Sequence, residues 1–143
     1  MTDNADTPVA PATTGLLDAS VVIALSGLKY EDLPEVPQIS TITLAELSVG
    51  PLVASTELER SARQAVLQQT EADFTPLPFD ARSARAFGQV AASLRQSGRK
   101  TSARSYDAMI AAVALANGLP LFTANPDDFS GIAGLVVHSV ATE

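Results

Sequence analysis

The strongest constraint on this chain is the alternation of short apolar runs with segments of helical periodicity. The apolar runs predict strands at 16–17, 38–41, 74–79, 119–123 and 135–140. Apolar spacing and capping signals predict helices at 20–25, from Thr43 to an interruption at Gly50, and at 56–69, 81–96 and 105–116. Strands that alternate with helices are typical of an α/β domain with a central, mainly parallel sheet covered on both faces.

One domain accommodates this pattern, because the chain has 143 residues and no internal repeat. Residues 1–15 are rich in Pro, Thr and Ala and carry no Lys or Arg, so we expect a disordered leader there and a single domain at 16–143. No apolar run is long enough to span a bilayer, and the absence of Cys excludes disulfides and thiolate chemistry. We therefore expect a cytoplasmic protein.

The net charge of −7 argues against a nucleic-acid partner until its distribution is considered. No Asp or Glu occurs from 81 to 106, a stretch that holds six of the nine basic residues: Arg82, Arg85, Arg95, Arg99, Lys100 and Arg104. An acidic protein can still present such a basic stripe to a phosphate backbone. A solvated helix face explains the same pattern, so both interpretations stay open.

Three acidic residues interrupt apolar sequence at the ends of predicted elements. Asp18 follows the first strand, Glu46 falls in the first turn of the helix from Thr43, and Asp107 opens an apolar helix. Ligand sites in parallel sheets lie beyond the carboxyl ends of the strands, so these carboxylates are expected to converge. Converging carboxylates repel one another unless a cation compensates, and Mg²⁺ prefers oxygen ligands. The pattern predicts a divalent-metal site that needs neither Cys nor His.

Each acid also has a purely structural interpretation. Thr43 and Glu46 have the spacing of a capping box. Asp18 stands where it can cap a short helix, and Asp107 stands where the helix dipole favours an acid. Capping is compatible with a site role, so these alternatives stay open. The single histidine, His138, lies in a strand predicted to be buried, where we expect a core role.

Four segments, in order, resemble the successive motifs of VapC-type PIN-domain ribonucleases, the toxins of type II toxin–antitoxin systems. They are Leu16-Leu-Asp-Ala-Ser-Val-Val, Ser40-Thr-Ile-Thr-Leu-Ala-Glu-Leu-Ser-Val-Gly, Tyr106-Asp-Ala-Met-Ile-Ala-Ala and Thr123-Ala-Asn-Pro-Asp-Asp-Phe. The resemblance runs from Leu16 to the C-terminus and implies a three-layer α/β/α PIN-like fold. It also implies an endoribonuclease that depends on Mg²⁺ or Mn²⁺ and cleaves RNA phosphodiesters by metal-activated water. A VapB-like antitoxin as cognate partner and a homodimer are further implications.

The resemblance assigns roles to individual residues. Asp18, Glu46 and Asp107 match the three acidic catalytic positions, which would hold metal and orient water. The fourth position falls on Asn125 by spacing, and Asp128 belongs to the neighbouring acidic-aromatic pair, so both are candidate metal ligands. The candidates for RNA contacts are a small hydroxyl residue and four bases of the stripe, namely Ser20, Arg95, Arg99, Lys100 and Arg104.

Other enzymes that place Asp at a strand end fit this sequence less well. A phosphatase of the haloacid-dehalogenase type needs a second Asp where this chain has Ser20, and a serine hydrolase needs a G-x-S-x-G elbow that is absent. The remaining alternative is a catalytically silent binding module whose acidic pocket captures a basic partner segment. Turnover of RNA that depends on a divalent ion and on Asp18 discriminates between the two.

Overall fold

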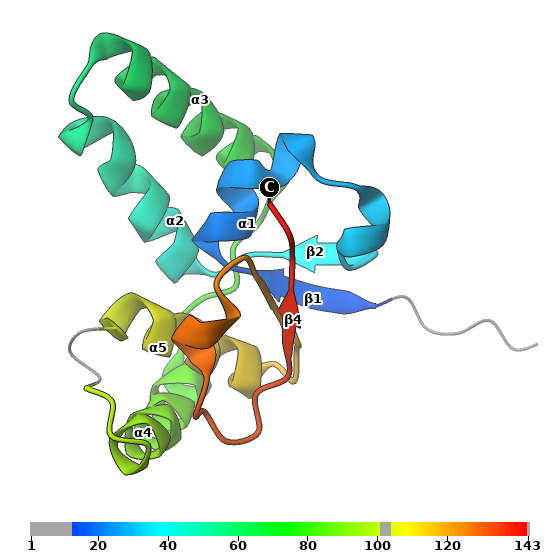
Figure 1. Ribbon diagram of the computed structural model, residues 1–143, viewed down its shortest axis with the longest axis vertical. Coiled ribbons are helices and arrows are strands. Elements are labelled where there is room, and N and C mark those ends of the chain that lie inside the picture. The colour runs from blue at the N-terminus through cyan, green and yellow to red at the C-terminus, as the bar shows by residue number, and fades with distance from the viewer. Residues whose placement is uncertain (1–12, 101–103, 143) are drawn as a thin grey trace, which may run out of the picture.

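The computed structural model describes residues 13–100 and 104–142, in which a four-stranded parallel sheet lies between two layers of helices (Figure 1). The strands are β1 (Thr14–Leu17), β2 (Val36–Gln38), β3 (Leu121–Thr123) and β4 (Val137–Ser139). The main helices are α1 (Ala19–Ala24), α2 (Thr41–Val49), α3 (Glu57–Asp73), α4 (Ala81–Gln96) and α5 (Ser105–Ala116). This architecture confirms the predicted three-layer α/β/α fold. Among the described helices, none combines the length and hydropathy needed to cross a membrane.

The sheet has the order β2–β1–β3–β4, so the chain begins in the middle of the sheet and adds strands on either side. All three strand pairs are parallel, and Leu16 lies opposite both Gln38 and Leu121. The order reverses between β1 and β3, and in open parallel sheets the crevice at such a point is where ligands bind. The predicted leader at 1–15 lies mostly outside the described residues, although Thr14 and Gly15 belong to β1.

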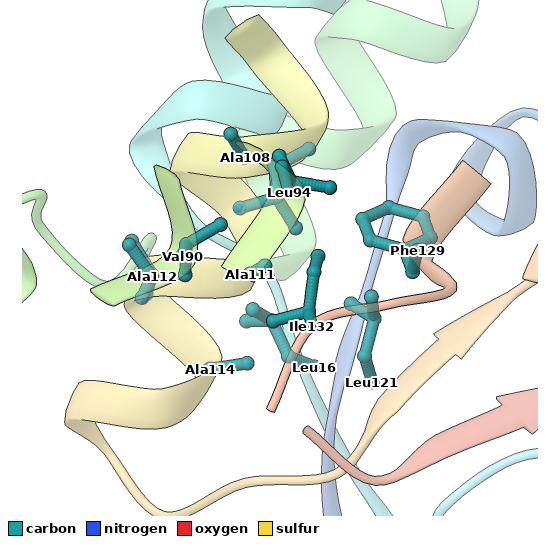
Figure 2. Close-up of a cluster of buried hydrophobic side chains, with 12 residues drawn as sticks. Leu16, Val90, Leu94, Ala108, Ala111, Ala112, Ala114, Leu121, Phe129 and Ile132 are labelled. Atoms are coloured by element: carbon teal, nitrogen blue, oxygen red, sulfur yellow. The ribbon is translucent and has the colours of Figure 1, made fainter. Parts of the chain in front are cut away.

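Side chains alternate along the central strands and so supply two separate cores. Leu16 and Leu121 face the layer formed by α4 and α5, where they pack with Phe129 and Ile132 (Figure 2). Helix α5 contributes the run 110–114, which is completely or almost completely buried. Burial on this scale explains why the sequence of α5 is nearly devoid of polar residues.

The second core lies on the opposite face of the sheet. Leu17 and Phe122 pack there with Val21 of α1 and Leu47 of α2. Helix α3 adds partly buried residues such as Val66, while most of its surface is exposed. The three helices α1, α2 and α3 thus form the layer that faces away from α4 and α5.

Helix starts with a clear cap agree with the sequence prediction, whereas α3 ends at Asp73, four residues beyond the predicted end. The Thr56 hydroxyl accepts a hydrogen bond from the N–H of Glu59 at 3.1 Å, and the Asp80 carboxylate accepts one from the backbone three residues ahead at 3.0 Å. Helices α4 and α5 have the predicted bounds, 81–96 and 105–116. The Asp80 cap was sufficient to place the start of α4, whereas α5 has no side-chain cap and was placed by its apolar sequence.

Helix α2 starts two residues earlier than predicted. Ser40 is its N-cap, because the Ser40 hydroxyl accepts a hydrogen bond from the N–H of Thr43 at 3.2 Å. The predicted capping box of Thr43 and Glu46 is therefore wrong, and Glu46 lies in the second turn rather than the first. The sequence prediction took Thr43 as the cap, and Ser40, three residues earlier, has that role in the structure.

Strand boundaries near α2 also differ from the prediction. Strand β2 covers Val36–Gln38 instead of 38–41, because Thr41 already belongs to α2. The segment 74–79 forms no strand, and Leu77 makes one isolated bridge to Ser40. Prolines on both sides of Leu77 lack the N–H that a continued ladder requires.

The last strand is an exposed edge rather than the predicted buried strand over 135–140. Strand β4 covers Val137–Ser139, and His138 is exposed on it, so the expected core role of His138 is wrong. The imidazole stacks on the ring of Phe122, with centroids 4.7 Å apart and planes at 11°. The same Phe122 ring lies over Gly15, where an added Cβ would come within 2.3 Å of the ring.

Candidate active site

Asp18 lies at the carboxyl end of β1, next to the point where the strand order reverses. Its N–H donates to the carbonyl of Phe122 in β3 at 3.1 Å, and its side chain is almost completely buried. Oδ1 of Asp18 accepts from the Ser20 hydroxyl at 2.5 Å and from the N–H of Val21 at 3.2 Å. Asp18 is thus the N-cap of α1, and this structural role coexists with its position at the crevice.

Two hydroxyl groups fix the Asp18 carboxylate across the boundary between β1 and β3. The Thr123 hydroxyl donates to Oδ2 of Asp18 at 2.5 Å and accepts from the N–H of Asn125 at 3.0 Å. The Ser20 hydroxyl, which donates to Oδ1, accepts from the N–H of Ala124 at 3.0 Å. Each hydroxyl accepts a backbone N–H and gives its one proton to an Asp18 oxygen. Both oxygens are therefore held, and the orientation of the carboxylate is fixed.

Thr123 is a site residue that the sequence prediction missed. It belongs to a quoted motif segment, but nothing in that segment singles out the threonine. Only its position identifies it: Thr123 ends β3, and the neighbouring strand β1 ends just before Asp18. That signal becomes usable only once β3 is known to pair with β1.

Glu46 reaches the same region from the second turn of α2. Burial, together with the negative charges of Asp107 and Asp18, raises the pKa of the Glu46 carboxyl from 4.5 to about 7. Mutual repulsion of this kind requires the three acids to lie close together. The structure therefore brings together the three acidic residues that the sequence singled out.

Asp107 lies in the first turn of α5, as predicted. Burial raises the pKa of its carboxyl from 3.8 to about 6, helped by the negative charges of Asp128 and Asp18. The positive charge of Arg104 opposes this shift. Asp107 is thus coupled to acids on both sides, and a single neighbouring cation offsets part of the repulsion.

The two candidates for the fourth position are placed differently. Asp128 lies in the 3₁₀ turn η6 (Pro126–Phe129), half-buried, and its charge acts on Asp107. The Asn125 side chain is exposed, and the backbone N–H of this residue donates to Thr123. Asp128 therefore belongs to the acidic cluster, whereas no described contact joins the Asn125 side chain to it.

The acidic cluster suits a hard divalent cation with few protein ligands. Within residues 13–100 and 104–142, no three acidic or histidine side chains are already arranged around a common point to chelate an ion. Mg²⁺ needs only one or two carboxylates and completes its shell with water. Burial first, and then mutual repulsion, raises the pKa values of Glu46 and Asp107, and a bound cation would favour the ionised form of both carboxyls.

The basic stripe does not form one continuous surface. Arg95, Arg99 and Lys100 line a hollow of about 530 Å³ at the end of α4. Nη1 of Arg99 is buried there without a hydrogen-bond partner among the described residues. Arg82 lies at the opposite end of α4 and donates to the carbonyl of Ala116 at 3.3 Å. Of the stripe, Arg95, Arg99 and Lys100 therefore gather into a basic hollow.

An apolar groove of about 540 Å³ lies beside Glu46. Ile23, Leu47 and Val66 line it, and Arg63 stands among them. Ile23 is 61% exposed, which is unusual for an isoleucine next to a hydrophobic core. A surface of this character is typical of sites that bind another polypeptide.

Comparison with known proteins agrees with this geometry. The PIN domain model matches residues 16–135. The chain is 40% identical to "Ribonuclease VapC5" from Mycobacterium tuberculosis over 123 residues, which cover 84% of this chain and 88% of that protein. It superimposes with a TM-score of 0.76 and 39% identity on a chain of VapBC-5, a toxin–antitoxin system of the same species, covering 91% and 98% of the two chains. For DNA-bound VapBC from Salmonella typhimurium the TM-score is 0.70 at 25% identity, covering 90% and 98%.

The parallel sheet with acids gathered at its carboxyl edge is consistent with the PIN-domain class, and the match over residues 16–135 shows that the chain belongs to this family. Two relatives that share most of its length are named VapC ribonucleases. The resemblance inferred from the four sequence motifs is thereby confirmed.

Proposed function

We propose that the chain is a divalent-metal-dependent endoribonuclease and the toxin component of a toxin–antitoxin module. The observation that carries this proposal is the acidic cluster at the β1–β3 crevice. Asp18, Glu46, Asp107 and Asp128 arrive there from four separate elements and perturb one another electrostatically. The names of the VapC relatives, which are ribonucleases, support the reaction class.

The hydroxyl network suggests a division of labour among the acids. Asp18, held in one orientation by Ser20 and Thr123, and Asp107 would bind Mg²⁺ or Mn²⁺. When bound, the ion supplies the positive charge that activates water and neutralises the phosphodiester. Glu46, whose pKa lies near neutrality, would orient the attacking water and accept its proton.

The RNA backbone would lie over the basic hollow of Arg95, Arg99 and Lys100. These residues lie near the end of α4 that precedes α5, the helix that carries Asp107. Their charges would compensate for an overall charge of −7, which on its own repels RNA. As in the sequence prediction, the substrate would be RNA and the site of action would be the cytoplasm.

The partner would be a VapB-like antitoxin. Several structural neighbours are VapBC complexes, among them VapBC-5 of Mycobacterium tuberculosis. The apolar groove beside Glu46 offers a surface for an antitoxin segment, and a basic side chain of that segment would reach the acids. Two copies of the chain would pair in the complete assembly.

The experiment is cleavage of a mixed RNA pool by the purified, antitoxin-free chain. Cleavage in Mg²⁺ or Mn²⁺ that leaves 5′-phosphate ends, stops in EDTA and disappears in Asp107→Asn would support the proposal. Circular dichroism of each variant shows that the fold is kept. If the folded wild-type chain cleaves no RNA with either ion, the binding-module alternative takes its place.

A further inference from the structure

The acidic cluster contains a cation of its own, the guanidinium of Arg104. Nη1 of Arg104 lies 2.5 Å from Oδ1 of Asp128 and 3.9 Å from Oδ2 of Asp107. Among the described residues, no other basic side chain forms an ion pair with any of the four acids of the cluster. Arg104 is therefore the local counter-ion of this site.

The backbone at Arg104 leaves its side chain free for this contact. Arg104 is the N-cap residue of α5, but its side chain makes no capping hydrogen bond. It reaches from α5 to η6, which Phe129 anchors in the core at 2% exposure. The pair joins two elements that are 24 residues apart in sequence, and it turns one Asp128 oxygen toward Arg104.

We propose that Arg104 competes with a divalent cation for the side of the acidic site formed by Asp107 and Asp128. The inference rests on the metal site of the proposed function and adds a regulator to it. A fixed positive charge in this place repels an incoming cation and neutralises Asp128. With Arg104 present, Asp128 is an ion-pair partner instead of a metal ligand, and the site accepts one ion with moderate affinity.

The pairing also reassigns two residues. Arg104 was predicted to contact RNA and Asp128 to bind metal, yet each satisfies the other in the structure. Removing Arg104 would leave the carboxylates of Asp107 and Asp128 without an ion-pair partner among the described residues.

The test is Mn²⁺ binding to the metal-free full chain, followed by the electron paramagnetic resonance signal of free Mn²⁺. Low ionic strength is needed because salt screens the effect, and a pH near 8 keeps Glu46 and Asp107 ionised. Arg104→Gln should lower the Mn²⁺ dissociation constant by about fivefold or more, or add a second bound ion. Arg104→Lys keeps the charge and should stay near the wild type.

Two further variants separate local from general effects. Arg85→Gln removes one positive charge from an exposed position of α4 and should leave Mn²⁺ binding unchanged. The double variant Arg104→Gln/Asp128→Asn removes the acid that Arg104 releases, so its dissociation constant should return toward the wild-type value. An equal gain in Arg85→Gln, or a full gain in the double variant, would overturn the proposal.

The result also distinguishes this inference from the proposed function. If the wild type binds Mn²⁺ and cleaves RNA but folded Arg104→Gln binds no more tightly, the inference about Arg104 fails alone. If Arg104→Gln binds Mn²⁺ and the wild type does not, the competition is supported. If neither binds Mn²⁺ and the wild type cleaves no RNA, both proposals fail.

Discussion

The hydroxyl of Thr123 donates a 2.5 Å hydrogen bond to Oδ2 of Asp18, joining the ends of two strands that are 105 residues apart in sequence. Replacing Thr123 with Val keeps the shape but leaves a buried carboxylate oxygen without its donor. We expect Thr123→Val to lower the free energy of unfolding by about 1–3 kcal/mol, measured by urea denaturation. Thr123→Ser keeps the hydroxyl and should lose much less. A wild-type midpoint for Thr123→Val would contradict this role.

Metal-free protein should lose stability as the pH rises through neutrality. The folded-state pKa values of Asp107 and Glu46, about 6 and about 7, lie above the ordinary values of 3.8 and 4.5. The folded state therefore binds more protons between about pH 4 and pH 7, so the free energy of unfolding falls across that window. Glu46→Gln and Asp107→Asn should each remove part of the fall, on the order of 1 kcal/mol because both side chains retain solvent contact. The exposed Glu71→Gln serves as the control, and an equal effect there would refute the assignment.

Divalent cations should stabilise the folded chain at pH 7.5. A ligand present at about a hundred times its dissociation constant adds about 2.7 kcal/mol, so Mn²⁺ should raise the melting temperature by several degrees. EDTA should reverse the shift, as differential scanning fluorimetry can show. Asp18→Asn and Asp107→Asn should abolish it. A shift of the same size in both variants would mean that the ion binds elsewhere.

Close contact between Gly15 and the Phe122 ring should make β1 intolerant of a methyl group. A Cβ at Gly15 would lie 2.3 Å from Cε1 of Phe122, so the ring or the strand must move. We expect Gly15→Ala to destabilise the chain by about 1–3 kcal/mol in thermal or urea unfolding. Gly88 lies in α4 with nothing within 4 Å of an added Cβ, so Gly88→Ala should instead stabilise by about 0.5–1 kcal/mol. Equal effects of the two substitutions would show that helix and strand propensities, rather than the ring contact, decide.

The basic hollow should control RNA affinity without affecting the fold. Arg95→Ala, Arg99→Ala and Lys100→Ala should each weaken binding of catalytically inactive protein to RNA. Each should also reduce the slope of log affinity against log salt by up to about one unit, because RNA binding then releases fewer counterions. Arg60→Ala is the control, since Arg60 pairs with Glu57 on α3. Unchanged salt slopes in all three variants would assign the stripe to a solvated helix face.

Most of the helical framework could be predicted because its signals are local. Asp80 caps α4 through a bond to its own chain neighbours, and a nearly unbroken apolar sequence marks α5 as buried. Boundaries became ambiguous where two local signals compete, as Ser40 and Thr43 do for the start of α2. The exposure of His138 had no local signal at all, because it depends on β4 having a partner on one side only.

The residues of the candidate site also divide into those that local sequence signals identified and those that only the fold reveals. Asp18, Glu46 and Asp107 stood out because each is an acid in apolar sequence near an element boundary, and the structure groups them. Their catalytic and metal-binding roles stay predictions. The contacts of Thr123 with Asp18 and of Arg104 with Asp128 span 105 and 24 residues, and no pattern within one segment encodes such pairs.

The Asp18 carboxylate both caps α1 and lies at the crevice. Replacing it with Asn to obtain an inactive protein would therefore also disturb the fold. An amide at residue 18 would present an NH₂ group to hydroxyl or backbone donors and would weaken the joint between β1, α1 and β3. Glu46 sits within a helix, caps nothing and is only partly buried. Glu46→Gln is therefore the better substitution for preparing folded, inactive protein in quantity.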